Sequence, residues 1–150
     1  MTAAVIRLMQ LSDVPAILEI QTNSPEAAQW SQSAYETLGL ATEMKAWVAE
    51  QQNGVAGFLV ARVVANELEI LNLAIELCFR RRGIGSALVG EVLSWGARNG
   101  AERVFLEVRA SNAFARKFYE AHGFTAAGLR PKYYSDPIED ALILVIPRRG

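Results

Sequence analysis

The sequence has 150 residues, of which 51% are hydrophobic, and its formal net charge is −1. A chain of this length and composition can bury a substantial core, so we expect one folded domain over residues 1–150 and exclude disorder. Because the charge is close to zero, no general field favours nucleic acid, and we expect no direct nucleic-acid partner. No apolar run approaches the roughly 20 residues that cross a membrane, and no signal-peptide pattern begins the sequence. We therefore expect a cytoplasmic protein without a membrane partner.

The first half of the sequence alternates apolar runs with turn residues. Ser12 is a suitable N-cap for a helix that contains Pro15 in its first turn. Asn53-Gly54 lies between two apolar runs, which is a strong hairpin signal. The elements expected in chain order are a strand at 5–8, a helix after Ser12, a loop at 22–29, a helix at 31–43, strands at 47–49 and 55–61, a turn at 65–66 and a strand ending near Ile75.

The second half alternates helices with strands. Apolar residues between Ile84 and Trp95 recur at helical spacing, and Asn99-Gly100 is a suitable C-terminal cap. Asn112 can begin the next helix, and Gly123 can end it. The expected elements are a helix at 83–99, a strand at 103–108, a helix at 112–122, and strands at 124–129 and 141–146 joined through 131–140. Antiparallel strands followed by this alternation predict a mixed α/β fold.

The chain contains one cysteine and one histidine. Cys78 alone makes neither an intramolecular disulfide nor a cysteine metal site, and its neighbours Leu77 and Phe79 predict a half-buried packing residue. His122 precedes Gly123, which favours a contact at a helix end. It has no recognised metal-ligand spacing with Cys78, so we expect no metal.

The segment Arg80-Arg81-Arg82-Gly83-Ile84-Gly85-Ser86 joins a predicted strand to a predicted helix. Glycines allow a ligand close to the backbone, and the first amides of a helix point outward without intrahelical partners. With the positive end of the helix dipole, these features predict a site for phosphate or pyrophosphate. It is not a P-loop, because no lysine follows Gly85. It is not a dinucleotide fingerprint either, because Leu88 stands where the third glycine belongs.

Arg80, Gly83 and Gly85 instead satisfy the pattern Gln/Arg-x-x-Gly-x-Gly/Ala. This pattern resembles the acetyl-CoA pyrophosphate loop of the GCN5-related N-acetyltransferases (GNAT). Three further groups of motifs follow in order: Leu106-Glu107-Val108-Arg109-Ala110-Ser111-Asn112; Phe118-Tyr119-Glu120-Ala121-His122-Gly123-Phe124; and Tyr133-Tyr134 with Glu139-Asp140-Ala141. Together they closely resemble the bacterial RimI group, whose members acetylate the N-terminal amine of a ribosomal protein.

The resemblance implies the GNAT fold, a twisted mixed sheet with helices on both faces and acetyl-CoA where two strands splay. It implies direct transfer in a ternary complex, with a peptide or protein N-terminus, such as that of a ribosomal protein, as the acceptor. The cofactor contacts that it carries over are Leu73, Ala74, Ile75, Arg80, Arg81, Arg82, Gly83, Ile84, Gly85, Ser86, Asn112 and Tyr119. For Asn112 the alternative is a capping role alone.

Glu107 is the candidate general base. A protonated α-amine, with a pKa near ~8, must lose a proton before it attacks a thioester, and a nearby carboxylate can accept that proton directly or through water. Strand alternation puts Glu107 with Phe105 and Arg109, opposite Leu106 and Val108. The alternative is therefore a solvent-facing glutamate paired with Arg109. The resemblance to the RimI group favours the base.

Tyr119 matches the family tyrosine that is assigned to protonate the CoA thiolate, and its alternative is core packing beside Phe118. Tyr133 and Tyr134 are expected to contact the acceptor together with Glu107, and their alternative is an aromatic hairpin with a solvated acidic turn. Three other functions stay open. They are acetylation of a small amine, non-catalytic binding of acetyl-CoA, and an accessory role on nucleic acid that only the arginine cluster 80–82 supports.

Overall fold

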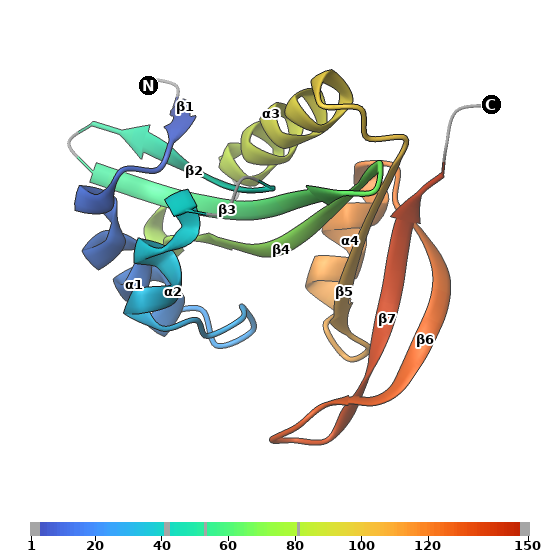
Figure 1. Cartoon of the computed structure of the whole chain (residues 1–150). Coiled ribbons are helices and arrows are strands. Elements are labelled where there is room, and N and C mark those ends of the chain that lie inside the picture. The colour runs from blue at the N-terminus through green and yellow to red at the C-terminus, as the bar shows by residue number, and fades with distance from the viewer. Residues whose placement is uncertain (1–3, 41–42, 53, 81, 148–150) are drawn as a thin grey trace.

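The computed structural model describes residues 4–40, 43–52, 54–80 and 82–147. Within these ranges seven strands form one mixed sheet in the order β1-β2-β3-β4-β5-β7-β6 (Figure 1). The strands are β1 Val5–Leu8, β2 Met44–Gln51, β3 Gly54–Val64, β4 Glu67–Ile75, β5 Arg103–Arg109, β6 Thr125–Tyr134 and β7 Glu139–Ile146. The helices are α1 Val14–Thr22, α2 Gln32–Glu36, α3 Ile84–Arg98 and α4 Ala113–Ala121, with 3-10 turns η1 Leu11–Asp13, η2 Leu38–Leu40 and η3 Leu77–Phe79. The predicted mixed α/β fold is confirmed.

β2, β3 and β4 form an antiparallel meander, as the turn signals predict, and β1 pairs antiparallel with β2. Gln51 pairs with Gly54 across the first hairpin, while Asn53 lies outside the described residues. Ala65 and Asn66 have φ of 50° and 66°, the left-handed conformation that a tight hairpin turn requires. Among the strands of the described ranges only β4 and β5 pair in parallel, and α3 provides the crossover between them.

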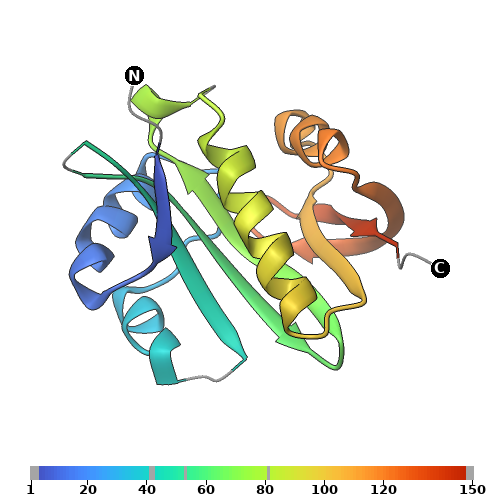
Figure 2. The ribbon, with the colours of Figure 1, turned by 90° about the horizontal axis from the view of Figure 1, so that it is seen from above.

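Helices cover both faces of the sheet, and each face has its own apolar core. Figure 1 shows α3 above the central strands and α1 with α2 below them, and Figure 2 looks down onto α3. The core under α3 and α4 is formed by buried residues such as Leu68, Leu88 and Leu106. The core under α1 and α2 is formed by residues such as Ile17 and Phe58. A side chain of β4 or β5 therefore belongs either to the α3–α4 face or to the α1–α2 face.

The start of α1 differs from the prediction. The residue that precedes the helix is Asp13, at the end of η1, and not Ser12. Both carboxylate oxygens of Asp13 accept hydrogen bonds from the Arg7 guanidinium, at 2.8 and 2.9 Å, and one also accepts the Gln10 amide at 2.7 Å. This buried ion pair fixes where the chain turns from β1 into α1, a tertiary effect that outweighs the capping preference of Ser12.

Three other expectations need correction. Ser31 caps α2 through the Ala34 amide as expected, but the helix ends at Glu36 and a 3-10 turn follows, so it is shorter than 31–43. β6 continues to Tyr134, so the connection to β7 is shorter than 131–140. Pro131 is tolerated inside β6 because this is an edge strand whose register shifts between Arg130 and Tyr134. Cys78 is exposed rather than half-buried, because η3 carries it on the surface. No helix in the described ranges is long and apolar enough to cross a membrane.

Candidate active site

A gap in the sheet between β4 and β5 creates the candidate site. The two strands pair only from Glu67–Arg103 to Glu69–Phe105. Beyond that point β4 stays paired with β3 and β5 stays paired with β7, so the strands diverge, as Figure 1 shows. A β-bulge where β3 pairs with β4, between Val60 and Ala61, adds to the bend of β4. The splay that the family resemblance implies is therefore present.

A cleft of about 1160 Å³ fills this gap and reaches both faces of the sheet. Every predicted site residue in the described part of the chain lines it, apart from Arg82: Leu73, Ala74, Ile75, Arg80, Gly83, Ile84, Gly85, Ser86, Glu107, Asn112, Tyr119, Tyr133 and Tyr134. Arg82 is exposed and lies over the Phe79 ring, with 5.7 Å between the guanidinium carbon and the ring centroid. Arg81 lies outside the described residues.

Glu107 enters the cleft from the α1–α2 face of β5. Its neighbours Leu106 and Val108 are buried in the opposite core, as the alternation of the strand predicts. The side chain of Glu107 is only 11% exposed, and its Oε1 lies 3.4 Å from Nε of Arg130. Its Oε2 is buried and has no hydrogen-bond partner among the described residues. The alternative pairing of Glu107 with Arg109 is wrong, because Arg109 contacts Glu139 at 3.4 Å.

Two tyrosines and two arginines surround Glu107 on this face. The charge of Glu107 is the main cause that raises the pKa of Tyr133, and the Arg130 guanidinium lies 5.5 Å from the Tyr133 ring centroid. Burial raises the pKa of Tyr134 to about 12, and Arg109 stacks 4.6 Å from its ring centroid. The hairpin of β6 and β7 thus brings both tyrosines beside the carboxylate. The aromatic packing of the alternative is also present, since the Tyr133 and Tyr134 rings meet edge-to-face with centroids 5.1 Å apart, so their contact with the acceptor stays a prediction.

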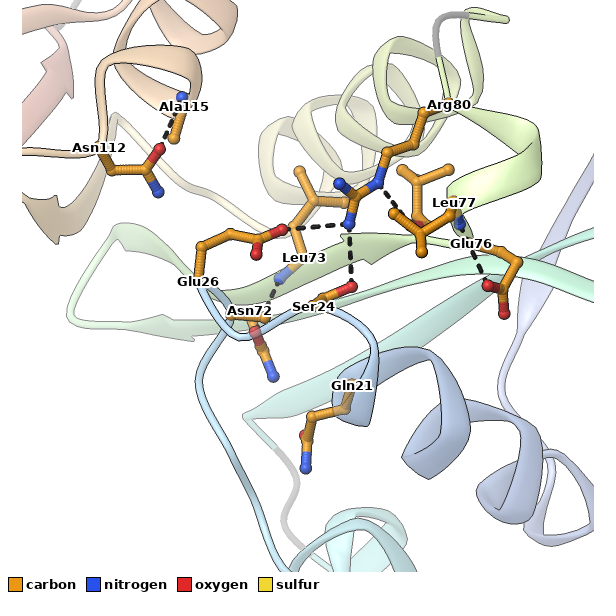
Figure 3. Close-up of polar contacts among 12 residues, drawn as sticks. Gln21, Ser24, Glu26, Asn72, Leu73, Glu76, Leu77, Arg80, Asn112 and Ala115 are labelled. Atoms are coloured by element: carbon orange, nitrogen blue, oxygen red, sulfur yellow. Dashed lines mark hydrogen bonds and ion pairs between the residues drawn. The ribbon is translucent and has the colours of Figure 1, made fainter.

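Tyr119 lies on the α3–α4 face of the same cleft. It belongs to α4, is 6% exposed, and packs edge-to-face against Phe118 and Phe124, with ring centroids 5.1 and 5.4 Å apart. Burial raises the pKa of its phenol above the ordinary value, so the hydroxyl keeps its proton at neutral pH. Asn112 begins this helix, and its Oδ1 accepts the Ala115 amide at 3.1 Å (Figure 3), so the predicted capping role is confirmed.

The glycine loop leads directly into α3. Gly83 has φ of 79°, which an L side chain rarely adopts, and the Ala87 amide donates to its carbonyl at 3.0 Å. The amides of Ile84, Gly85 and Ser86 therefore begin the helix without intrahelical acceptors. A Cβ at Gly85 would lie 3.1 Å from Cζ of Phe118, so glycine permits α3 and α4 to approach each other at the cleft. This geometry is suited to bind a pyrophosphate through backbone groups.

Arg80 does more than the sequence pattern predicts. Its Nε donates to the Ile75 carbonyl at 3.0 Å, and one terminal nitrogen lies 3.1 Å from both Ser24 Oγ and Glu26 Oε1 (Figure 3). The guanidinium thereby joins the end of β4 to the connection between α1 and α2. The sequence offered no sign of these partners, because they lie more than 50 residues away along the chain.

The connection between α1 and α2 is a wall of the cleft that the sequence did not identify. Residues 25–30 line the cleft opposite the β6–β7 hairpin, and Asn72 of β4 holds them from behind. The sequence marked this segment only as a polar loop. The one available signal was Asn72 itself, a polar residue that interrupts the apolar run of the strand.

Of the two residues with reactive side chains, Cys78 lies outside the cleft, and His122 reaches its edge through Ser86, which lines it. Cys78 is not among the residues that line the cleft. His122 caps the end of α4 and its Nε2 lies 3.0 Å from Ser86 Oγ, as the expected helix-end contact requires. Within the described ranges no group of three His, Cys, Asp or Glu side chains is arranged to hold a metal ion.

Comparison with known proteins decides the family. The sequence model of the Acetyltransferase (GNAT) family matches residues 14–124. The chain belongs to this family. It is therefore an acetyl-CoA-dependent N-acetyltransferase, and the GNAT resemblance of its motifs is confirmed.

Its relatives include enzymes of the RimI group. The ribosomal protein bS18-alanine N-acetyltransferase of Escherichia coli (strain K12) is 33% identical over 147 residues, covering 95% of this chain and 96% of the relative. The enzyme of the same name from Salmonella typhimurium is 31% identical over 152 residues, with 95% and 96% covered. The crystal structure of the Escherichia coli ribosomal-protein-S18-alanine N-acetyltransferase has a TM-score of 0.82 at 30% identity, covering 98% of this chain and 96% of that one.

More distant GNAT-family structures share the fold. Arabidopsis thaliana NAA60 in complex with acetyl-CoA has a TM-score of 0.84 at 19% identity, with 95% of this chain and 97% of that chain covered. At this identity the likeness shows the GNAT fold alone.

Proposed function

We propose that this GNAT-family enzyme transfers an acetyl group from acetyl-CoA to the N-terminal α-amine of a protein, and that its acceptor is a ribosomal protein with an N-terminal alanine. The observation that carries the proposal is Oε2 of Glu107, which is buried inside the cleft and has no hydrogen-bond partner in the described part of the chain. A buried carboxylate oxygen without a partner is unfavourable unless a donor arrives during function, and an amine is such a donor. The resemblance to bS18-alanine N-acetyltransferases supports the acceptor class.

The two faces of the cleft have separate roles in this proposal. The amides at the start of α3 bind the pyrophosphate, and the splayed edge of β4 at Leu73–Ile75 offers backbone groups to the pantetheine arm. The acceptor enters on the opposite face, between residues 25–30 and the hairpin that carries Tyr133 and Tyr134. Acetyl-CoA supplies the acetyl group as a thioester, and the gap between β4 and β5 is where the two substrates meet.

In this proposal Glu107 is the proton acceptor and Tyr119 is the proton donor. Glu107 accepts the proton of the acceptor ammonium, directly or through a water, and the freed amine nitrogen forms its bond to the acetyl carbon. The carbon–sulfur bond breaks, and Tyr119 donates its phenolic proton to the leaving thiolate. The nitrogen loses its second proton as the amide forms, and that proton restores the Tyr119 phenol. The transfer is direct and forms no acyl-enzyme, which agrees with the position of Cys78 outside the cleft. Replacement of Cys78 by serine is accordingly expected to preserve turnover.

The test is a thiol-release assay with acetyl-CoA and three kinds of acceptor: an alanine-led ribosomal peptide, the same peptide with a blocked N-terminus, and a panel of amino acids and polyamines. Mass spectrometry locates the acetyl group. We expect turnover with the free peptide alone and the acetyl group on its α-amine. Turnover with small amines and not with the peptide would contradict the proposed acceptor and establish a small-molecule acetyltransferase. Tight acetyl-CoA binding without turnover of any acceptor would favour a binding module.

A further inference from the structure

A short irregular segment forms one wall of the acceptor side of the cleft. Residues 25–30 connect α1 to α2, line the cleft, and include the exposed residues Ala28 and Gln29. Ala27 and Trp30 pack against the α1–α2 core, and polar groups fix the backbone between and before them. The side chain that does most of this is Asn72, which lies on the α1–α2 face of β4 and is only 5% exposed.

Both polar groups of the Asn72 side chain hydrogen-bond to the backbone of Ala28. Its Oδ1 accepts the Ala28 amide at 3.1 Å, and its Nδ2 donates to the Ala28 carbonyl at 2.9 Å. Its Nδ2 also donates to the Tyr35 hydroxyl, and its Oδ1 also accepts the Leu73 amide, each at 3.1 Å. A carboxamide has two donor and two acceptor positions, and all four are used here. The side chain therefore hydrogen-bonds to the Ala28 backbone in the way that a neighbouring β-strand would.

The contacts continue beyond Asn72 to both ends of the wall. The Tyr35 hydroxyl donates to Gln21 Oε1, and Gln21 Nε2 donates to the Trp30 carbonyl at 2.8 Å. Gln29 Nε2 lies within 3.1 to 3.2 Å of the carbonyls of Gln21, Ser24 and Ala27. Trp30 also packs on Tyr35, with 5.5 Å between ring centroids. The wall is thus held at its first residues, at its centre and at its end.

Core packing alone does not account for this arrangement. Asn72, Gln21 and Ser24 are three of the five buried polar or charged residues in the described part of the chain. The side chains of Asn72 and Gln21 contact this segment, whereas Ser24 contributes its backbone carbonyl, which accepts from Gln29 Nε2. Apolar side chains at these positions would fill the same space without the desolvation penalty of buried amides. What the polar side chains add is one defined backbone path for residues that face the cleft.

We propose that Asn72 is a positioning residue for the acceptor, one that fixes the wall against which the acceptor peptide binds. The inference rests on the proposed function, since it assigns a peptide to this face of the cleft. Because residues 25–30 are ordered before the peptide binds, binding does not lose the conformational entropy of ordering them. Protein groups occupy all four hydrogen-bonding positions of Asn72, so we expect its effect in acceptor affinity and not in the chemical step.

The experiment compares Asn72→Ala, Gln29→Ala and the control Gln32→Ala in steady-state acetylation of the alanine-led peptide. Gln29 is exposed, so its variant keeps the test valid if Asn72→Ala fails to fold. Gln32 is also exposed but contacts Glu36 on α2, away from the cleft. We expect the peptide KM of the first two variants to rise about tenfold, with kcat within about twofold of the wild type. The acetyl-CoA KM is compared in Gln29→Ala, which leaves the Leu73 amide and its Asn72 partner in place, and is expected to stay within about twofold. The control is expected to match the wild type.

Hydrogen exchange gives a second readout that needs no turnover. The Ala28 amide is expected to exchange at least about tenfold faster in Asn72→Ala than in the wild type, and β1 amides are expected not to change. A lower melting temperature with an unchanged peptide KM would reduce Asn72 to a structural residue and overturn the proposal. If the wild type acetylates no peptide, the proposed function fails together with the assignment of this wall to a peptide. The exchange rate of Ala28 then still decides whether Asn72 holds the wall.

Discussion

At the scale of single residues, Glu107 is the side chain whose environment is most specific. Its side chain is 11% exposed in the cleft, with one oxygen beside Arg130 and the other without a hydrogen-bond partner among the residues that the structure describes. We expect Glu107→Gln to lower kcat by about 100-fold or more, since general bases contribute roughly 10² to 10⁴. The deficit is expected to shrink above pH ~8, because the α-amine then loses its proton without help. Initial rates between pH 6.5 and 9.5 measure this.

The control for Glu107 is Arg130→Gln, which removes the neighbouring cation and keeps the carboxylate. Arg130 is a half-exposed partner at 3.4 Å, so we expect a change in kcat of less than about fivefold. A Glu107→Gln variant with the pH profile and the kcat of the wild type would rule out the base role.

Tyr119 gives the second prediction at this scale. Burial raises the pKa of its phenol, so the group is a proton donor and not a phenolate at working pH. Tyr119→Phe keeps the ring contacts with Phe118 and Phe124 and removes only the hydroxyl. We expect kcat to fall about 10- to 100-fold, while the free energy of unfolding changes by less than about 1 kcal/mol. A fall in the free energy of unfolding that is as large as the rise in the activation free energy would instead indicate a packing role.

At the scale of elements, the start of α3 depends on the absence of a side chain at Gly85. A Cβ there would lie 3.1 Å from Phe118, whereas a Cβ at Gly90 of the same helix would meet nothing within 4 Å. We expect Gly85→Ala to weaken acetyl-CoA binding about tenfold, because the added methyl group displaces the Phe118 ring, which lines the cleft. Gly90→Ala is expected to leave binding unchanged and to stabilise the helix by about 0.5–1 kcal/mol. Calorimetric titration and thermal unfolding measure the two effects.

The junction of β1 with α1 predicts a pH dependence of stability. The hydrogen bonds from Arg7 lower the pKa of the Asp13 carboxyl below its ordinary value of 3.8. At a pH between the pKa of Asp13 in the folded chain and its ordinary value in the unfolded chain, the unfolded chain binds more protons than the folded chain. The stabilisation is therefore complete above pH 3.8 and is lost as the pH falls toward the folded-state pKa.

Asp13→Asn is expected to lower the free energy of unfolding by about 2 kcal/mol at pH 7, and the difference from the wild type is expected to narrow below pH 4. Denaturant unfolding at pH 7 and pH 3 measures both. Glu120→Gln removes an equal charge from an exposed position on α4 and serves as the control, with an expected change near zero. A difference that stays constant with pH would contradict the role of the ionised pair.

At the scale of the whole molecule, the gap between β4 and β5 joins the two faces of the sheet, so that a ligand bound there contacts distant parts of the chain. Acetyl-CoA at 100 times its Kd is expected to add about 2.7 kcal/mol to the free energy of unfolding, or roughly 5–10 °C in Tm. Hydrogen exchange is expected to slow at Leu73–Ile75 and at the first turn of α3, but not in β1. Protection spread evenly over the chain would argue against binding in the splay.

Much of the fold and part of the site followed from the sequence itself. Turn residues such as Ala65-Asn66 and helix ends such as Asn112 and Gly123 have local causes, namely backbone conformation and capping, which a sequence expresses directly. The glycine loop and Glu107 lie in ordered motifs, and the family they indicated is confirmed. The alternation of β5 also assigned Glu107 correctly to the face opposite Leu106.

Only the tertiary structure decided which residues far apart in the sequence contact each other. Glu107 contacts Arg130 and not its neighbour Arg109, Asp13 rather than Ser12 precedes α1, and Arg80 reaches back to Ser24 and Glu26. Each of these features depends on a contact between residues of different elements, including that of Arg7 with Asp13, so no local sequence pattern predicts them. The wall at residues 25–30 is the clearest case. Its path is set by Asn72 of a strand 44 residues later, because an irregular segment takes its conformation from the partners that surround it.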